Sequence, residues 1–178
     1  MKKLHNIHLT PANGNLVEIY KTEIGGYPKF YKMDPLAKLG FVASELLLKK
    51  EQKATGEERF VEREDRAIVL VNYSASRAAD LKYEETIVTG ENYFPSPADF
   101  VYTLPNIVTG EIAIRNHYYG ESNFKCVADK AAVEELVNLA FSDTMTCSVL
   151  GGWLEYKSAD DYEAELSIWI RQTSKMRQ

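Results

Sequence analysis

Hydrophobic residues recur at helical spacing in the segment after residue 33, which predicts a long helix. Asp34-Pro35 offers an N-cap acceptor followed by a proline suited to the first helical position. The expected apolar face comprises Leu36, Leu39, Ala43, Leu46 and Leu47. Lys38, Glu45 and the run from Lys49 to Glu51 are expected on the surface, and KKEQKATGEER is expected to end the helix in a solvated loop.

The next hydrophobic run predicts a strand. Residues Ala67 to Tyr73 (AIVLVNY) are almost uniformly apolar, which is typical of a central strand covered on both faces. The segment from Ser74 to Tyr83 is expected to be a polar crossing. Three prolines at 95, 97 and 105 make a helix unexpected before Asn106, where a short helix should begin and run to Gly120.

The second half of the chain predicts one amphipathic helix and a hairpin. Between Asp129 and Phe141, the apolar positions Val133, Leu136, Val137 and Ala140 share one face, and Glu134, Glu135 and Asn138 point away from it. Two strands, 147–156 and 163–170, are joined by the acidic turn SADDY. Early strands separated by helices and a paired end predict an α/β fold with a mixed sheet and packed helices. The pattern of residues 1–33 assigns no architecture beyond an apolar run at 16–20 and a turn at Gly25-Gly26.

Composition narrows the class of protein. The 178 residues correspond to one domain, 1–178, and 45% of them are apolar, enough for a substantial core. The net charge of −5 argues against nucleic acid as a partner. No stretch approaches the roughly 18 apolar residues of a membrane span, and the lysines at the N-terminus are followed by no continuous apolar region, so a cytoplasmic location is expected.

The two cysteines, Cys126 and Cys147, form no CxxC motif and have no histidine cluster near them in the sequence. Neither a metal site nor a disulfide framework is therefore indicated, and no cofactor is expected. Cys147 lies within an expected strand and should belong to the core.

Two segments carry a family resemblance. The stretch SPADFVYTLPNIVTGEIAIRNHYYGE, residues Ser96 to Glu121, resembles the β-ketoacyl synthase signature, and the helix over 129–141 leads into CSVLGGWLEY, whose Gly151-Gly152 pair lies where that family has its own. The chain thus resembles the N-terminal half of a 3-oxoacyl-ACP synthase, in the thiolase superfamily. The resemblance implies a single thiolase-like half, whereas a complete ketosynthase fuses two halves in one polypeptide.

The resemblance also makes Cys126 a positional candidate for the catalytic nucleophile. In the family this cysteine lies at a helix N-terminus, where amides and the helix dipole lower the pKa of the thiol. Cys126 lies 25 residues before Gly151 and is expected directly before the helix beginning near Asp129. However, its surroundings, NFKCVADKAA, lack the family's small residues, and Asp129 would oppose a thiolate. The resemblance further implies that the basic residues handling decarboxylation belong to the absent C-terminal half.

Structural interpretations compete with catalytic ones at the other conspicuous residues. A small apolar, non-catalytic role is the alternative for Cys126, and His117 is interpreted as a residue that complements the C-terminal end of a helix. Pro105 and Asn106 should fix the turn into a helix, with Asn106 as a cap. The Gly151-Gly152 pair should permit close backbone approach and not bind phosphate.

Three functional hypotheses follow from the resemblance. The first is a non-catalytic partner, like a chain length factor, of a complete ketosynthase in fatty-acid, polyketide or polyene biosynthesis. The second is an acyltransferase subunit that uses Cys126 with groups from a partner chain, and the third is an interaction module without acyl chemistry. A homo-oligomer or a ketosynthase complex is expected, and an acyl carrier protein would require a local basic patch such as Lys49, Lys50 and Lys53.

Overall fold

The computed structural model describes residues 1–88 and 95–172. Its strands are β1 (Lys2–Leu9), β2 (Arg66–Asn72), β3 (Ser122–Cys126), β4 (Ser148–Ser158) and β5 (Asp161–Ile170). Its α-helices are α1 (Leu16–Ile19), α2 (Pro35–Thr55), α3 (Arg77–Val88), α4 (Pro97–Tyr102), α5 (Asn106–Asn116) and α6 (Ala132–Ala140). Short helical turns at Pro11–Asn13, Tyr20–Ile24 and Pro28–Lys32 surround α1.

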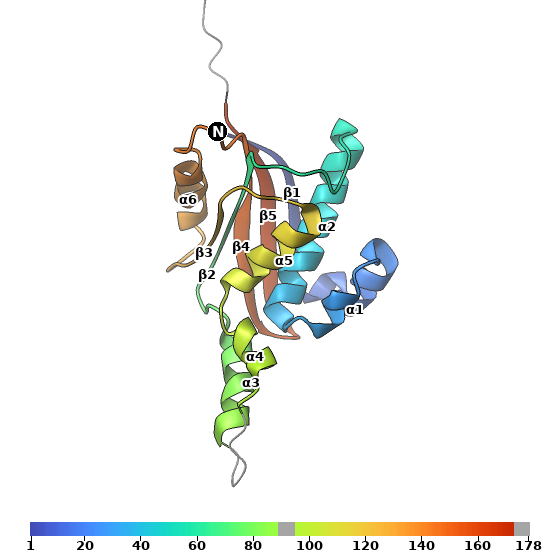
Figure 1. The fold of residues 1–178 in the computed structure, drawn as a ribbon, viewed down its shortest axis with the longest axis vertical. Coiled ribbons are helices and arrows are strands. Elements are labelled where there is room, and N and C mark those ends of the chain that lie inside the picture. Colours follow the sequence, from blue (N-terminus) through green and yellow to red (C-terminus); the bar gives the residue numbers. More distant parts are fainter. Residues whose placement is uncertain (89–94, 173–178) are drawn as a thin grey trace, which may run out of the picture.

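The strands form one mixed sheet in the order β1-β5-β4-β2-β3 (Figure 1). Strand β2 runs parallel to both β3 and β4, because α-helical crossovers connect them, whereas β5 is antiparallel to β4 and to β1. Helices α2 and α5 cover one face of the sheet and α6 covers part of the other (Figure 1). The expected α/β fold with a mixed sheet and packed helices is therefore confirmed.

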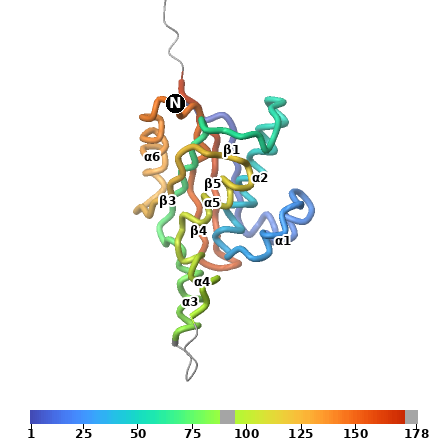
Figure 2. The backbone as a smooth tube through the Cα atoms, viewed as in Figure 1, coloured from blue at the N-terminus to red at the C-terminus, as the bar shows by residue number. Residues whose placement is uncertain are grey.

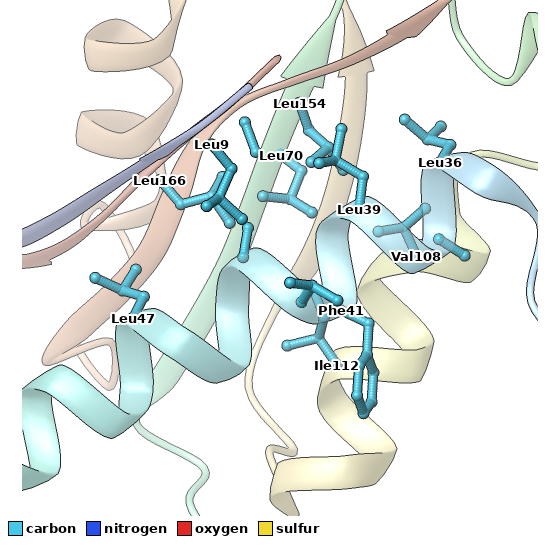
Figure 3. Close-up of a cluster of buried hydrophobic side chains, with 14 of the residues drawn as sticks. Leu9, Leu36, Leu39, Phe41, Leu47, Leu70, Val108, Ile112, Leu154 and Leu166 are labelled. Atoms are coloured by element: carbon cyan, nitrogen blue, oxygen red, sulfur yellow. The ribbon is translucent and has the colours of Figure 1, made fainter. Parts of the chain in front are cut away.

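The larger core lies between the sheet and the α2–α5 layer. Side chains of both helices interdigitate with those of β1, β2, β4 and β5, and Figure 3 shows Leu9, Leu36, Leu39, Phe41, Leu47, Leu70, Val108, Ile112, Leu154 and Leu166 in this layer. Gly40 allows the two helices to approach closely, since a Cβ there would lie 2.4 Å from Cγ1 of Val108. The α2–α5 contact therefore requires a residue without a side chain at this position.

A smaller core lies on the opposite face, under α6. Val137 and Ala140 of this helix pack on Ala67, Val69 and Val149 of the sheet. As predicted, Glu134, Glu135 and Asn138 are exposed, so α6 is two-faced. In Figure 2 the helix lies to one side of the sheet, near β2, β3 and β4, and away from α1 and α2. Trp169 of β5 also packs in this smaller core.

The long helix begins as predicted but ends later and is more deeply buried. The side chain of Asp34 accepts hydrogen bonds from the amides of Leu36 and Ala37, and Pro35 occupies the first turn. The helix continues through the lysine-rich run to Thr55, and Gly56 ends it in a left-handed conformation. Two residues expected on the surface, Glu45 and Glu51, are buried. They are tolerated there because arginines from later segments neutralise them, which helical periodicity cannot reveal.

Strand β2 is buried at every position and has neighbours on both sides, which confirms the central strand. The expected polar crossing after it is wrong, since most of it forms α3. Helix α4 also contradicts the argument from prolines: the Ser96 side chain caps it and Pro97 takes the first turn, where a proline costs nothing. Strand β1 and strand β3, both at sheet edges, had no periodic signal strong enough to predict them.

Candidate functional site at the start of helix α6

Cys126 does not lie at a helix N-terminus. It is the last residue of β3 and exposed, and residues 127–131 separate it from the start of α6, contrary to the expectation of direct adjacency. Alternation along β3 places Cys126 on the same face as Phe124, which packs in the α2–α5 core, and α6 lies over the other face. The amides at the start of α6 therefore do not surround this thiol.

Lys130 lies immediately before the start of α6. Its Nζ lies 2.6 Å from Oε1 of Glu163 and 3.6 Å from Oε2 of Glu165, both on β5. The same ammonium lies over the indole ring of Trp153, 5.9 Å from the ring centroid. A cation at this end of a helix opposes the helix dipole, and the two carboxylates offset that cost together with Asp129, whose Oδ1 accepts a hydrogen bond from the amide of Ala131 at 2.7 Å. The start of α6 is thus occupied by an ion-paired lysine.

A small cavity of about 160 Å³ adjoins this cluster. Its walls are the first turn of α6 and the face of β4 and β5 that α6 partly covers, including the buried residues Trp153, Ser167 and Trp169. The backbone approaches closely at Gly152, where a Cβ would lie 2.0 Å from the carbonyl oxygen of Glu165. The sequence-based interpretation of the glycine pair, close backbone approach, is confirmed. A cavity of this volume is large enough for a molecule about the size of benzene.

The electrostatics of the cluster favour ionised Glu163. Burial by itself would raise the pKa of this carboxyl group, but hydrogen bonds from Lys130 and His8 outweigh it and leave the pKa below the ordinary value. His8 Nε2 lies 2.9 Å from Oε1 of Glu163. The chemistry available here is cation and anion pairing, and no thiol takes part in it.

Sequence reasoning missed this cluster. His8 pairs in register with Glu165 across β1 and β5, whose residues are more than 150 positions apart in the chain. Lys130, which lies before α6, pairs with Glu163 and Glu165 of β5. Cys126 and Glu163 belong to strands separated by β2 and β4, about 14 Å at the usual strand spacing. A pairing that depends on sheet register leaves no local sequence signal.

Other sequence-based predictions have mixed outcomes. His117 ends α5 in a left-handed conformation, in agreement with its predicted place at a helix end. Asn106 is not a cap: its Oδ1 accepts a hydrogen bond from the amide of Phe124 and so ties α5 to β3. Cys147 is exposed, contrary to the prediction of a core residue, because it precedes β4 and its backbone, not its side chain, joins the sheet region through Asp65.

The expected basic patch is partly neutralised. Lys49 Nζ lies 3.4 Å from a carboxylate oxygen of Glu23, and Lys50 Nζ donates to the carbonyl of Asn6.

Within residues 1–88 and 95–172, no group of three or more His, Cys, Asp and Glu is placed to hold a metal ion. No helix in that part of the chain is both long and apolar enough to cross a bilayer.

Solved structures of other proteins have a fold similar to that of this chain. No protein-family profile and no curated protein matches the sequence. Among solved structures, the chain is similar to the ishigamide ketosynthase/chain length factor, with a TM-score of 0.65 and 17% identity over 89% of this chain and 49% of that one. It is also similar to the complex of the ketosynthase ApeO with its chain length factor ApeC from Xenorhabdus doucetiae, with a TM-score of 0.64 and 10% identity over 96% of this chain and 79% of that one.

The chain therefore has a thiolase-like fold of the kind found in ketosynthase and chain length factor proteins. It spans about half the length of the ishigamide protein that it matches. The fold predicted from the ketosynthase resemblance is thus confirmed.

Proposed function

We propose that this chain is a non-catalytic, ketosynthase-like partner, of the chain-length-factor kind, in polyketide, polyene or fatty-acid assembly. The observation that carries this proposal is the start of α6, where Lys130 is paired with Glu163 and Glu165 and no thiol is present. Cys126 is exposed at the end of β3, six residues before α6 begins, and within residues 1–88 and 95–172 no basic side chain is hydrogen-bonded to it. A nucleophilic cysteine needs helix amides or a basic side chain beside it to form a thiolate at neutral pH.

The proposal treats residues 1–178 as one thiolase-like half that works with a complete ketosynthase. The two solved structures named above each include a chain length factor, and one of them is a complex of a ketosynthase with that factor. This supports a ketosynthase as the partner of the present chain. A homo-oligomer is the alternative assembly. An acyl carrier protein would bind through the patch of Lys49, Lys50 and Lys53, in which Lys49 is paired with Glu23 and Lys50 donates to the carbonyl of Asn6.

The arm formed by α3 and α4, residues 77–88 and 95–104, is the surface we assign to the ketosynthase. It extends beyond the end of the sheet (Figure 1). Lys82 is paired with Asp99, and Tyr83 packs against Phe100 with ring centroids 5.5 Å apart, so the two helices support each other. Exposed apolar side chains on the arm are Leu81, Ile87, Phe100, Val101 and Leu104. Grouped exposed apolar residues are typical of a protein interface.

The test pairs the purified chain with a complete ketosynthase from the same genome. We expect a complex by size-exclusion chromatography, and a change in the length of the product that the ketosynthase forms, measured by mass spectrometry. Phe100→Glu should weaken the complex at least tenfold because a charge would be buried at the contact. Leu139→Glu is the matched control, since Leu139 is 64% exposed on α6, away from the arm.

The same assay separates the competing functions. If Cys126→Ala leaves the product unchanged and no acyl adduct forms on the wild-type chain, the non-catalytic role is supported. Loss of product with Cys126→Ala, together with an adduct on Cys126, would establish the acyltransferase subunit instead. Normal ketosynthase products in the presence and absence of the chain, with no complex, would leave only the interaction module without acyl chemistry.

A further inference from the structure

Arg115, in the last turn of α5, is a cation held between two aromatic rings. Its guanidinium carbon lies 4.5 Å from the ring centroid of Phe60 and 5.3 Å from that of Tyr27. The side chain is 19% exposed. It makes no hydrogen bond to any described residue, and its nearest carboxylate oxygen, Oε2 of Glu45, lies 3.7 Å from Nε. The rings fix the orientation of a guanidinium whose donors remain free.

A second guanidinium shares the same carboxylate. Arg59 uses one nitrogen, Nη2, to donate to Glu45 Oε1 at 2.8 Å and to Asn116 Oδ1 at 2.7 Å. The Nε atoms of Arg59 and Arg115 are the buried side-chain polar atoms without a hydrogen bond among the described residues. Glu45 is itself buried and also accepts from Asn116 Nδ2. Two cations therefore share one anion, and the cluster carries one uncompensated positive charge.

This cluster forms part of the wall of a groove of about 630 Å³. The other charged groups along the groove are Lys49, Glu23 and Glu58. Lys49 and Glu23 pair with each other, and Glu58 is exposed. The buried donors without a hydrogen bond among the described residues belong to the two arginines. The groove lies on the α2–α5 side of the molecule and shares no residue with the Lys130 cluster.

Phe60 is held in an unusual conformation to reach its place between the guanidinium groups. Its φ is 65°, in the left-handed region that residues other than glycine rarely adopt. Its ring lies 4.7 Å from the guanidinium carbon of Arg59 as well as beside Arg115. Strained backbone that persists at a cluster of unpaired polar groups is typical of a binding site.

From these contacts we propose that the groove binds an oxyanion group, a phosphate or a carboxylate, carried by a larger ligand. The anion accepts hydrogen bonds from the free Nη groups of Arg115 and from Arg59, and its charge balances the second guanidinium. The volume of the groove exceeds that of the oxyanion alone, so the remainder of the ligand lies along Phe60 and Gln52. This site is independent of the function proposed above, since it uses neither the arm nor Cys126.

The test titrates inorganic phosphate and, separately, acetate into the wild-type protein at constant ionic strength. Side-chain ¹H–¹⁵N NMR of the arginine Nε–H groups reports directly on the site. We expect saturable shifts of the Arg115 and Arg59 resonances. Arg115→Gln should weaken binding at least tenfold, Arg115→Lys should weaken it less, and Arg77→Gln should leave it unchanged, because Arg77 is exposed on α3, outside the groove.

Tighter binding of phosphate than of acetate identifies a phosphate ester as the ligand class, and the reverse identifies a carboxylate. If neither anion shifts these resonances at up to about 50 mM, or if Arg77→Gln weakens binding as much as Arg115→Gln, the site does not exist. The NMR titration of the wild-type protein gives this answer even if Arg115→Gln fails to fold.

Discussion

Arg66 of β2 donates two hydrogen bonds of 2.7 Å to the carboxylate of Glu51, near the end of α2. Both side chains are buried, with exposed fractions of 3% and 10%. Burial by itself would lower the pKa of Arg66, but its hydrogen bonds to Glu51 and the negative charges nearby outweigh burial and raise the pKa. The pair joins the sheet to the longest helix at a point where either charge alone would be buried without a countercharge.

Glu51→Gln is therefore expected to destabilise the protein strongly. The substitution leaves the buried guanidinium of Arg66 without a countercharge, which typically costs about 3 to 5 kcal/mol of unfolding free energy. Urea unfolding followed by circular dichroism measures the change. Glu57→Gln is the control, because Glu57 is 62% exposed and lies 3.6 Å from its arginine, so its effect should stay within about 0.5 kcal/mol. Equal losses in the two variants would contradict the role assigned to the pair.

Two glycine substitutions should change the free energy of unfolding in opposite directions. In Gly152→Ala the new Cβ would lie 2.0 Å from the carbonyl oxygen of Glu165, and because this neighbour is backbone the strand must shift, at a cost of at least about 3 kcal/mol. In Gly110→Ala nothing lies within 4 Å of the new Cβ, so helix α5 should gain about 0.5 to 1 kcal/mol. Thermal unfolding of both variants checks the pair. A stable Gly152→Ala would show that β4 and β5 approach less closely than described.

The cluster at α6 predicts a pH-dependent difference between wild type and Lys130→Met. Because the folded-state pKa of Glu163 lies below the ordinary 4.5, its stabilising contribution is present above that value and is lost as the pH falls through the folded pKa. Wild type should be more stable than the variant by less than about 1 kcal/mol near pH 6 to 7, since the pair is partly exposed, and the difference should shrink as the pH falls below 4.5.

Unfolding curves across that pH range measure the difference. Lys157→Met removes an exposed lysine paired with Asp161, outside the cluster, and serves as the control. A difference that grew on acidification would reverse the sign and exclude Lys130 as the group that lowers the pKa of Glu163.

Asp34→Asn should be neutral or stabilising at pH 7. Burial raises the pKa of Asp34, although the amides of Ala37 and Leu36 act in the opposite direction, so the ionised carboxylate is disfavoured in the folded state. The contribution of Asp34 to the free energy of unfolding is thus complete below its pKa in the unfolded state, and it is lost as the pH rises through its pKa in the folded state. Asparagine keeps the capping oxygen without the charge.

Asp34→Ala removes the cap itself and should cost about 1 kcal/mol. The measurement is the unfolding free energy of wild type, Asp34→Asn and Asp34→Ala at pH 4 and pH 7. Relative to Asp34→Asn, wild type should be more stable at pH 4 than at pH 7. A loss in Asp34→Asn as large as that in Asp34→Ala would show that the negative charge, and not the oxygen, supports the helix.

Local chemistry determined much of this protein. The Asp34-Pro35 start of α2, the buried strand β2, the two-faced helix α6 and the β4–β5 hairpin all follow from caps and periodicity that act within a few residues. The Gly151-Gly152 pair likewise predicted a close approach of neighbouring backbone, which the structure shows between β4 and β5 at Gly152. These features depend on near neighbours in the sequence, so the sequence alone was sufficient for them.

Tertiary structure decided the rest, because the remaining pairings join residues far apart in the chain. The negative charges of Glu45 and Glu51 predict surface positions for both residues. These carboxylates can be buried only because Arg59 and Arg66, from later segments, are hydrogen-bonded to them. The position of Cys126 relative to α6 depends on where β3 ends and on which face its side chains take. Lys130, Glu163 and His8 meet through the register of the sheet, which no single segment of the sequence specifies.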